Sequence, residues 1–317
     1  MRKRNLGMLV TSSLYVVAAL AVACLPAAAD NPLRIAILHW YAAGNAAFGV
    51  GAVPSHVAFD GFSIWAPNHS DNTVTKLRAG DGARLGTFAV GTQPFGVAFD
   101  GANIWVTNSG TNTVTKLRAS DGKPRGTFTV GTEPLGVAFD GANIWVANGK
   151  DNNVMKLRNS DGAVLQTIPV GTLPDGMAFD GANIWVMNYE DNTVTKQRAS
   201  NGTKLGTFSV GMGPGEAAFD GANIWVTNFF SDTVTKLRAS DGATLGTFAV
   251  GHGPVGVAFD GANIWVANFG TNNVTQLRAS DGRPLGTFAV GTAPEGVAFD
   301  GANIWVANTG SNTVSKL

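Results

Sequence analysis

The sequence predicts an all-β protein, a seven-bladed β-propeller, from three observations: a 40-residue repeat, four strand-like segments in each copy, and a matching segment ahead of the first copy. The copies follow one another without insertion and begin at Gly51, Gly91, Gly131, Gly171, Gly211, Gly251 and Gly291. Four strands in about 40 residues are typical of a propeller blade, whereas the coil of a β-helix is much shorter. We therefore expect seven antiparallel blades of four strands each.

Each copy holds four short segments rich in β-branched and aromatic residues, which is typical of strands. In the second copy they cover residues 96–100, 103–108, 113–118 and 126–130. Turn-forming pairs follow the first and third segments, Asp100-Gly101 and Asp121-Gly122,. Pro94 is expected in the link between blades, where its missing N–H costs no ladder hydrogen bond.

The two ends of the repeated region complement each other. The seventh copy lacks its fourth segment, while residues 45–50 align in frame with the fourth segment of the first copy, residues 85–90. We expect this N-terminal segment to complete the last blade as its outer strand, closing the ring and removing an exposed edge. The expected domains are a signal peptide (1–29), a lead-in (30–44) and a single propeller (45–317).

The N-terminal region has the pattern of a secretory signal peptide. Three basic residues at positions 2–4 precede a mostly apolar run at 9–25, and small residues allow cleavage after Ala29,. The single cysteine, Cys24, leaves an alternative open, a lipoprotein cleavage box with a lipid anchor at that residue,. Either route predicts a secreted or periplasmic bacterial protein whose folded part has no disulfide.

Composition excludes several classes of partner and of active site. The 22 Lys and Arg residues balance the 22 Asp and Glu residues, so no net field favours nucleic acid or an anionic membrane. No second apolar run is long enough to span a membrane,. Four histidines and one cysteine support no Ser-His-Asp or Cys-His arrangement, and no P-loop occurs,. We expect a monomer with no catalytic residues and no cofactor.

Two aromatic positions recur once in every copy, and their regularity indicates packing between blades. The tryptophans are Trp65, Trp105, Trp145, Trp185, Trp225, Trp265 and Trp305. The phenylalanines are Phe59, Phe99, Phe139, Phe179, Phe219, Phe259 and Phe299.

The repeat resembles known propeller families over residues 45–317. Ile-Trp-Val-Thr-Asn at Ile104 and Ile224 resembles the YVTN repeat, and Pro-x-Gly-Val-Ala-Phe-Asp-Gly is similar to the opening of NHL repeats. The resemblance implies the fold strongly and the function weakly, because such propellers include surface-layer proteins, binding proteins and a few enzymes.

One enzyme family with a similar repeat, the virginiamycin B lyases, uses histidines and glutamates with magnesium. Its pattern has a catalytic histidine after the blade proline, where this sequence has Ser55, Phe95, Leu135, Asp175, Gly215, Val255 and Glu295. Its pattern has a glutamate three residues after the tryptophan, where this sequence has Asn68, Asn108, Asn148, Asn188, Asn228, Asn268 and Asn308. The resemblance therefore implies the fold and argues against lyase activity.

The copies differ mainly in the inter-blade links and in the loops between the second and third strands, which strand reversal brings to one face. Four aromatic residues in equivalent loops of blades four, five and six predict a binding patch there for a glycan, peptide or protein: Tyr189, Phe229, Phe230 and Phe269,. The alternative is that these rings only cover their own loops.

Four further residues lie in links that approach the channel mouth and offer metal-ligating side chains: His56, Glu216, His252 and Glu295,. If they converge, they predict a divalent-metal site. Glu133, Asp175 and Glu190 add negative charge to the same face, which suits a cationic ligand better than an anion,.

The sequence thus predicts a secreted, non-catalytic binding scaffold. Two alternatives remain open, a metal-dependent lyase or hydrolase at the channel mouth and a structural protein of the surface-layer type. The Lys-Leu-Arg segments, such as residues 76–78, are expected to be charged edges that discourage strand pairing,.

Overall fold

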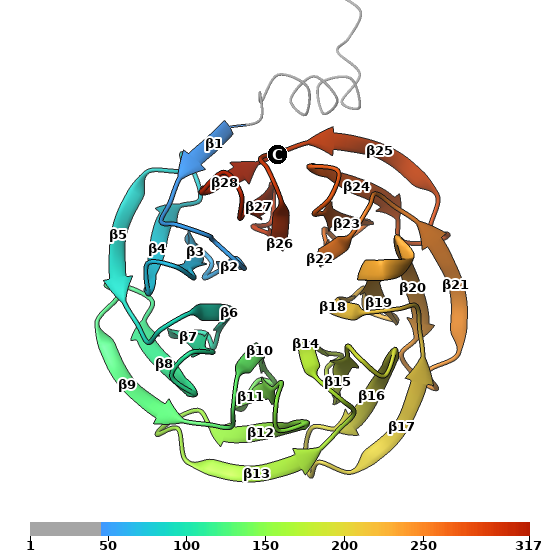
Figure 1. Cartoon of the computed structure of the whole chain (residues 1–317), viewed down its shortest axis with the longest axis horizontal. Helices are drawn as coiled ribbons and strands as arrows, with labels where there is room; N and C mark the ends of the chain where they lie inside the picture. Colours follow the sequence, from blue (N-terminus) through green and yellow to red (C-terminus); the bar gives the residue numbers. More distant parts are fainter. Residues whose placement is uncertain (1–45) are drawn as a thin grey trace, which may run out of the picture. The chain divides into compact units, whose positions relative to one another are not determined.

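The computed structural model describes residues 46–317, which form seven antiparallel four-stranded sheets arranged in a ring (Figure 1). The expected seven-bladed β-propeller is confirmed. In this part of the chain the one helical element is the single turn η1 (Phe229–Ser231), and no helix is long and apolar enough to cross a membrane. The expected signal peptide, the lead-in and the lipidation alternative at Cys24 lie outside the described residues.

The strands of each blade follow one another from the centre of the ring outward (Figure 1). The innermost strands are β2 (Ala58–Phe59), β6 (Pro94–Phe99), β10 (Pro134–Phe139), β14 (Pro174–Phe179), β18 (Pro214–Phe219), β22 (Pro254–Phe259) and β26 (Pro294–Phe299). The second strands are β3 (Ser63–Asn68), β7 (Asn103–Asn108), β11 (Asn143–Asn148), β15 (Asn183–Asn188), β19 (Asn223–Asn228), β23 (Asn263–Asn268) and β27 (Ile304–Asn308).

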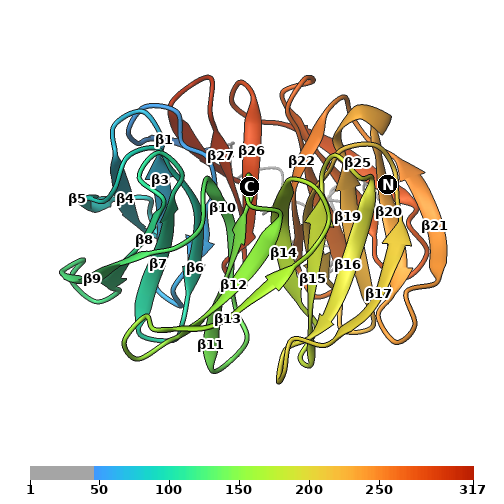
Figure 2. The same cartoon turned by 60° about the horizontal axis from the view of Figure 1, so that its bottom comes forward.

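The remaining two strands of each blade form its outer half, and all strands run between the two faces of the ring (Figure 2). The third strands are β4 (Thr73–Arg78), β8 (Thr113–Arg118), β12 (Asn153–Arg158), β16 (Thr193–Arg198), β20 (Thr233–Arg238), β24 (Asn273–Arg278) and β28 (Thr313–Lys316). The outer strands are β5 (Arg84–Ala89), β9 (Pro124–Thr129), β13 (Val164–Pro169), β17 (Lys204–Ser209), β21 (Thr244–Ala249), β25 (Pro284–Ala289) and β1 (Ala46–Gly49).

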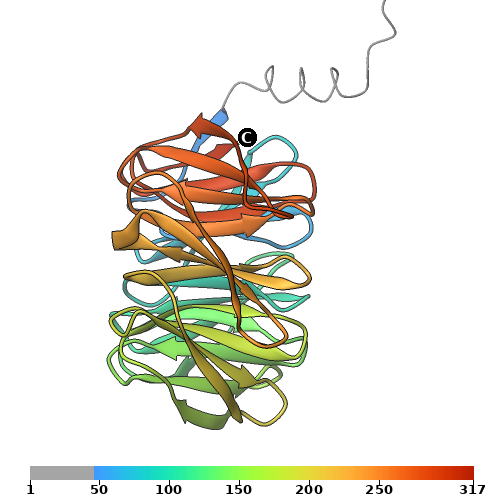
Figure 3. The same cartoon turned by 90° about the vertical axis from the view of Figure 1, so that its right-hand side faces the viewer.

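The N-terminal strand completes the last blade, as the sequence predicts. Strand β1 pairs antiparallel with β28, with Phe48 opposite Val314, and in Figure 3 the blue β1 lies against the red strands of that blade. The Phe48 ring packs 5.7 Å from Trp305, as Phe88 packs 5.5 Å from Trp65 in the first blade. The two ends of the propeller are therefore joined by strand pairing and by a repeated aromatic contact.

The repeated tryptophans form the core between neighbouring blades. Trp65 is fully buried and packs against Ile104 and Val106 of the next blade. Its indole N–H donates to Asp60 at 2.7 Å, and the other oxygen of Asp60 accepts the Ser63 N–H. The aspartate of Phe-Asp-Gly therefore closes its turn, as expected, and also satisfies a buried indole donor.

Each complete inner strand starts two residues earlier than the sequence predicts. Pro94 lies opposite Asn108 as the first residue of β6, and the register shifts between Pro94 and Val97. A proline at the first residue of a strand, beside an irregularity, removes no regular ladder bond. Pro94 can therefore begin strand β6 and lie opposite Asn108, whereas the sequence pattern placed it in the link between blades.

The lysines of the Lys-Leu-Arg segments are interior residues, so their expected role at an edge is wrong. Lys76 is 6% exposed, its Nζ lies 5.0 Å from the centroid of the Trp65 ring, and it donates to the Ala119 carbonyl of the next blade at 2.6 Å. The reason is that the outer strand covers the third strand, so the edge lies one strand farther out. The same contact with a neighbouring blade recurs at Lys116, Lys156, Lys196, Lys236 and Lys316.

Candidate functional site

The inter-blade links and the loops between second and third strands lie together on one face of the ring, here called the top face. The Ser109 N–H donates to the Gln93 carbonyl at 3.0 Å within one blade. The Asn72 side chain of the preceding blade accepts the Gln93 N–H at 3.0 Å. Each link is thus held by its own blade and by its neighbour, which gives the top face a fixed backbone.

Tyr189, Phe229, Phe230 and Phe269 form one continuous row across blades four, five and six, here called the aromatic patch. Ring centroids are 5.8 Å apart for Tyr189 and Phe230, 5.1 Å for Phe229 and Phe230, and 6.4 Å for Phe229 and Phe269. Phe230 is 60% exposed and Phe269 37%, while the other two rings are half-buried. The structure therefore brings together all four residues that the sequence singled out.

Two glycines make room for these rings. A Cβ at Gly213 would lie 2.8 Å from Phe230, and a Cβ at Gly253 would lie 3.2 Å from Phe229. The other five blades have a side chain at this position of the link: Val53, Gln93, Glu133, Leu173 and Ala293. The aromatic patch is thus accommodated by changes in two separate segments, and the glycines at 213 and 253 are the signal of it in the sequence.

The patch combines covered and open surface. Phe229 packs against the link of the next blade at Gly253, so this ring covers backbone of a neighbouring blade and not of its own loop. Phe230 stays mostly exposed, and beside it Met212 is 54% exposed and accepts the Phe230 N–H at 3.1 Å through its carbonyl. The packing of Phe229 therefore covers only part of the patch, and Phe230 and Met212 leave apolar surface exposed,.

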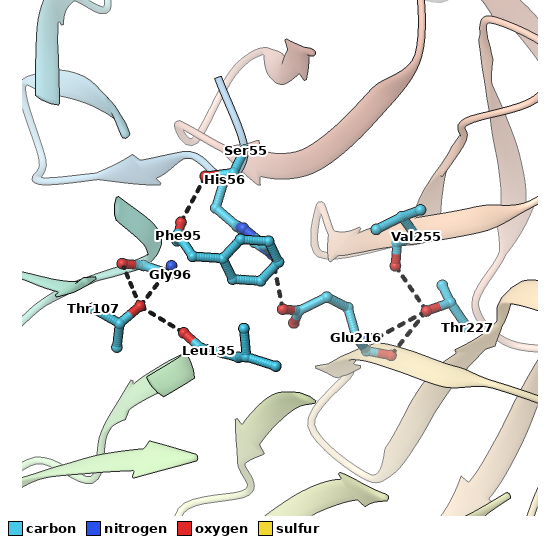
Figure 4. A network of polar contacts seen from close by, with 9 residues as sticks. All are labelled: Ser55, His56, Phe95, Gly96, Thr107, Leu135, Glu216, Thr227 and Val255. Carbon is cyan, nitrogen blue, oxygen red and sulfur yellow. Dashed lines mark hydrogen bonds and ion pairs between the residues drawn. The ribbon is translucent and has the colours of Figure 1, made fainter. Parts of the chain in front are cut away.

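At the channel, one equivalent position per blade faces the centre of the ring, and five of the seven residues are glycine: Gly96, Gly136, Gly176, Gly256 and Gly296. The other two, His56 and Glu216, meet across the channel, with Nε2 and Oε1 3.1 Å apart (Figure 4). The Phe95 ring packs against the imidazole, with centroids 4.6 Å apart. His56, Glu216 and four of the glycines, all but Gly176, border a cavity of about 180 Å³.

Buried charge dominates the channel mouth. Burial raises the pKa of Asp175 to about 7, and the charges of Glu216 and Glu295 add to this effect. Burial also raises the pKa of Glu295. For His56, burial alone would lower the pKa, but the hydrogen bond to Glu216 and the surrounding carboxylates outweigh it and hold the pKa above its usual value. The site thus holds one imidazole among three carboxyl groups, and burial opposes the ionisation of two of these groups, Asp175 and Glu295,.

Of the four residues expected to bind a metal, the structure brings His56 and Glu216 into contact and places Glu295 within electrostatic range of His56. His252 lies elsewhere: its ring is 71% exposed and its Nδ1 is 3.0 Å from Asp232, a partner that we had not expected. Among residues 46–317, no group of three or more His, Cys, Asp or Glu side chains is placed to hold a metal ion. Metal binding here stays a prediction.

The asparagines at the glutamate positions of the lyase pattern have a structural role. Asn108 is fully buried, accepts the Gly91 N–H at 3.0 Å and donates to Thr113 and Thr115. Equivalent asparagines accept the corresponding glycine N–H in five of the other six blades, while Asn308 of the last blade donates to Thr313 and Ser315. These side chains attach each link to its blade and are not open to a substrate.

No protein-family model matches the chain, and no curated protein matches it. Among solved structures it is similar to a streptogramin B lyase, with 17% identity and a TM-score of 0.74 over 86% of this chain and 96% of the other. A catalytically inactive virginiamycin B lyase from Staphylococcus aureus with quinupristin gives the same identity and TM-score over 86% and 98%. Hydrazine synthase from Kuenenia stuttgartiensis is similar at 18% identity and a TM-score of 0.73 over 84% and 95%. At these identities the similarity shows the propeller fold, and the likeness to YVTN and NHL repeats stays a resemblance.

Proposed function

We propose that this protein is an exported, non-catalytic propeller that binds a glycan, peptide or protein on its top face, with the aromatic patch as the main contact. The observation that carries the proposal is the continuity of four rings from three blades, two of them exposed. Exposed aromatic side chains supply a large contact area at a small entropic cost, and contiguous apolar patches are typical of binding surfaces.

A thermal-shift screen of the purified protein against glycans, peptides and divalent metals tests this proposal. We expect at least one glycan or peptide to raise the melting temperature of the wild type and not that of Phe230→Ser. Phe62→Ser is the matched control, because Phe62 is 65% exposed in a turn on the opposite face. An equal loss of the shift in both variants would place the binding surface elsewhere.

A metal-dependent lyase or hydrolase at the channel mouth is the second candidate, and the His56–Glu216 contact is the observation that favours it. Their mutual hydrogen bond and the distance of His252 from this pair leave fewer free ligands than the sequence suggested. A metal-dependent thermal shift that chelator reverses and His56→Ala abolishes would favour this candidate over the binding scaffold.

A surface-layer role is the third candidate, and it differs from the others in oligomeric state. A binding scaffold is expected to be monomeric, whereas a surface-layer protein self-associates. Analytical ultracentrifugation over a hundredfold range of concentration separates these outcomes.

A further inference from the structure

We propose that the partner of the aromatic patch is a basic polypeptide segment, with an apolar side chain packed on Phe230 and Phe269 and lysine or arginine side chains beside the surrounding carboxylates. This inference rests on the proposed function and narrows the partner to one chemistry. It follows from the charge around the patch, the state of the individual carboxylates and the shape of the surface.

The top face of blades four to six is rich in carboxylates and has no lysine or arginine in its links and loops. Its links and loops, residues 171–176, 189–193, 211–216, 229–233, 251–256 and 269–273, contain no lysine or arginine. They contain the carboxylates Asp175, Glu190, Asp191, Glu216 and Asp232. Complementary potentials steer and select partners, so this surface favours a cationic one.

Some of these carboxylates have no basic side chain of the protein beside them. His252, the one basic side chain of these segments, already lies against Asp232, and Lys150 of the third blade pairs with Glu133 at 3.1 Å. Glu190 is exposed and directly follows Tyr189 of the patch. Within the described residues, no lysine or arginine forms an ion pair with Glu190 or Asp191. A cation from a partner has these groups available next to the exposed rings.

The channel mouth extends the same field to the patch. Tyr189 is half-buried, and burial together with the charge of Asp175 raises its pKa. Asp175 therefore acts electrostatically on the first ring of the row. A partner lying along the row would therefore meet the free carboxylates of the outer loops, and the charge of Asp175 where this group is ionised.

The surface fits a polypeptide better than a small molecule. Small ligands occupy concave sites of about 300–1,000 Å³, whereas the channel cavity measures about 180 Å³ and the patch stands on exposed loops. Its rings meet at steep angles, 89° for Phe229 and Phe230 and 63° for Tyr189 and Phe230, which gives an uneven apolar surface. Aromatic residues and methionine within a polar rim are typical of the centre of a protein interface.

Fluorescence anisotropy with three labelled ten-residue probe peptides tests the inference on the purified protein. The probes alternate Lys and Leu, Lys and Ser, or Glu and Leu. We expect the Lys-Leu probe to bind at least tenfold more tightly than either other probe, because only this probe matches both the rings and the charge. Raising NaCl from 50 to 300 mM should weaken its binding, since exposed charges are screened by salt.

Matched variants separate the contribution of the aromatic rings from that of the carboxylates. Phe230→Ser should weaken the Lys-Leu probe about tenfold, while Phe62→Ser should leave it unchanged. The double variant Glu190→Gln/Asp191→Asn should weaken it by at least threefold and flatten the salt dependence. Its control is Glu133→Gln/Asp151→Asn, because Asp151 accepts the Thr132 N–H at 2.8 Å just as Asp191 accepts the Thr172 N–H at 2.8 Å.

Other outcomes overturn the inference in distinguishable ways. Equal affinity for the Glu-Leu and Lys-Leu probes, or equal loss in the two double variants, would contradict a basic partner. If a neutral oligosaccharide binds in a Phe230-dependent manner and no peptide does, the proposed binding function stands and this inference fails. If no probe or glycan depends on Phe230, both fail.

Discussion

The Nζ of Lys316 lies 2.8 Å from the carbonyl oxygen of Ala79, so the last blade is attached to the first by the same contact that Lys76 makes with the second blade. The ammonium group also lies 5.2 Å from the centroid of the Trp305 ring. Each such lysine therefore places a cation between an aromatic ring and backbone carbonyls of the neighbouring blade.

Removing one of these lysines should destabilise the ring. Lys196 is 5% exposed and donates to Ala239 at 2.6 Å and to Ser240 at 3.2 Å. Lys196→Met keeps the side-chain volume and leaves two carbonyls without this donor, which should lower the free energy of unfolding by about 1–3 kcal/mol. Urea denaturation measures this, with Lys204→Met on an exposed outer strand as the control. Equal stability of the two variants would mean that the contact contributes nothing.

The glycine of the Asp-Gly turn between the third strand and the outer strand of a blade should tolerate no side chain. Gly122 has a φ of 72°, and a Cβ there would collide with the Phe88 ring of the preceding blade. Gly122→Ala should cost about 1–3 kcal/mol through backbone strain and overpacking. Gly80→Ser is the contrast, because Gly80 has open space around it and most equivalent positions already hold serine. A thermal melt in which Gly122→Ala matches Gly80→Ser would contradict the packing described above.

Loss of the closing strand should open the last blade. Deletion of residues 45–50 removes the partner of β28 and the Phe48 ring that covers Trp305. We expect a lower melting temperature and aggregation through the exposed edge, measured by light scattering during a thermal ramp. Phe48→Ala should lower stability by about 2–4 kcal/mol and keep the edge paired. A clean monomer with an unchanged melting temperature after the deletion would refute the role of β1 in closure.

Asp175 should make stability depend on pH in the direction opposite to an ordinary paired carboxylate. Its pKa of about 7 in the folded protein lies above the usual 3.8, so folding is opposed by its ionisation. This cost is absent near pH 4 and grows as the pH rises to 7. Asp175→Asn should therefore stabilise the protein by about 1–4 kcal/mol at pH 8 and have little effect at pH 4.

Asp100→Asn should change the stability in the opposite direction when the same pH dependence is measured. Burial of Asp100 would raise its pKa, but hydrogen bonds from Trp105, Ala102 and Asn103 outweigh burial and hold the pKa below its usual value. The ionised Asp100 stabilises the folded protein at every pH above the usual pKa of an aspartate. This stabilisation is lost as the pH falls through the lower pKa that Asp100 has in the folded protein. Asp100→Asn should thus destabilise at pH 8 and progressively less in acid. Parallel pH profiles for the two variants would contradict the charge environment assigned to the channel mouth.

Most of the fold could be predicted from the sequence because the repeat fixes its own alignment. The Asp-Gly turns, the segment 103–108 and the closing strand follow from spacing and residue type, and the structure places them as expected. The role of Lys76 was predicted wrongly, although the sequence places a fourth strand, here β5, outside the third. What the pattern does not show is that the lysine side chain lies over the Trp65 ring and reaches a carbonyl of the next blade.

The candidate site was only partly predictable, for a related reason. The alignment of loops shows that Tyr189, Phe229, Phe230 and Phe269 belong to neighbouring blades, and the structure brings them together. The contact of His56 with Glu216 spans the channel between blades one and five, so it depends on the reach of side chains, which alignment does not give. For His252 the nearer Asp232 of the preceding blade provides the partner, a local pairing that follows from the link geometry.

Equilibrium titration of the strongest ligand from the screen, against wild type, Phe230→Ser and Phe62→Ser, tests the central claim most directly. The claim is that the protein binds its partner through the aromatic patch on the top face. We predict at least a tenfold loss of affinity for Phe230→Ser, about 1.4 kcal/mol, with unchanged affinity for Phe62→Ser. Full affinity in Phe230→Ser, or a loss in Phe62→Ser alone, would contradict it.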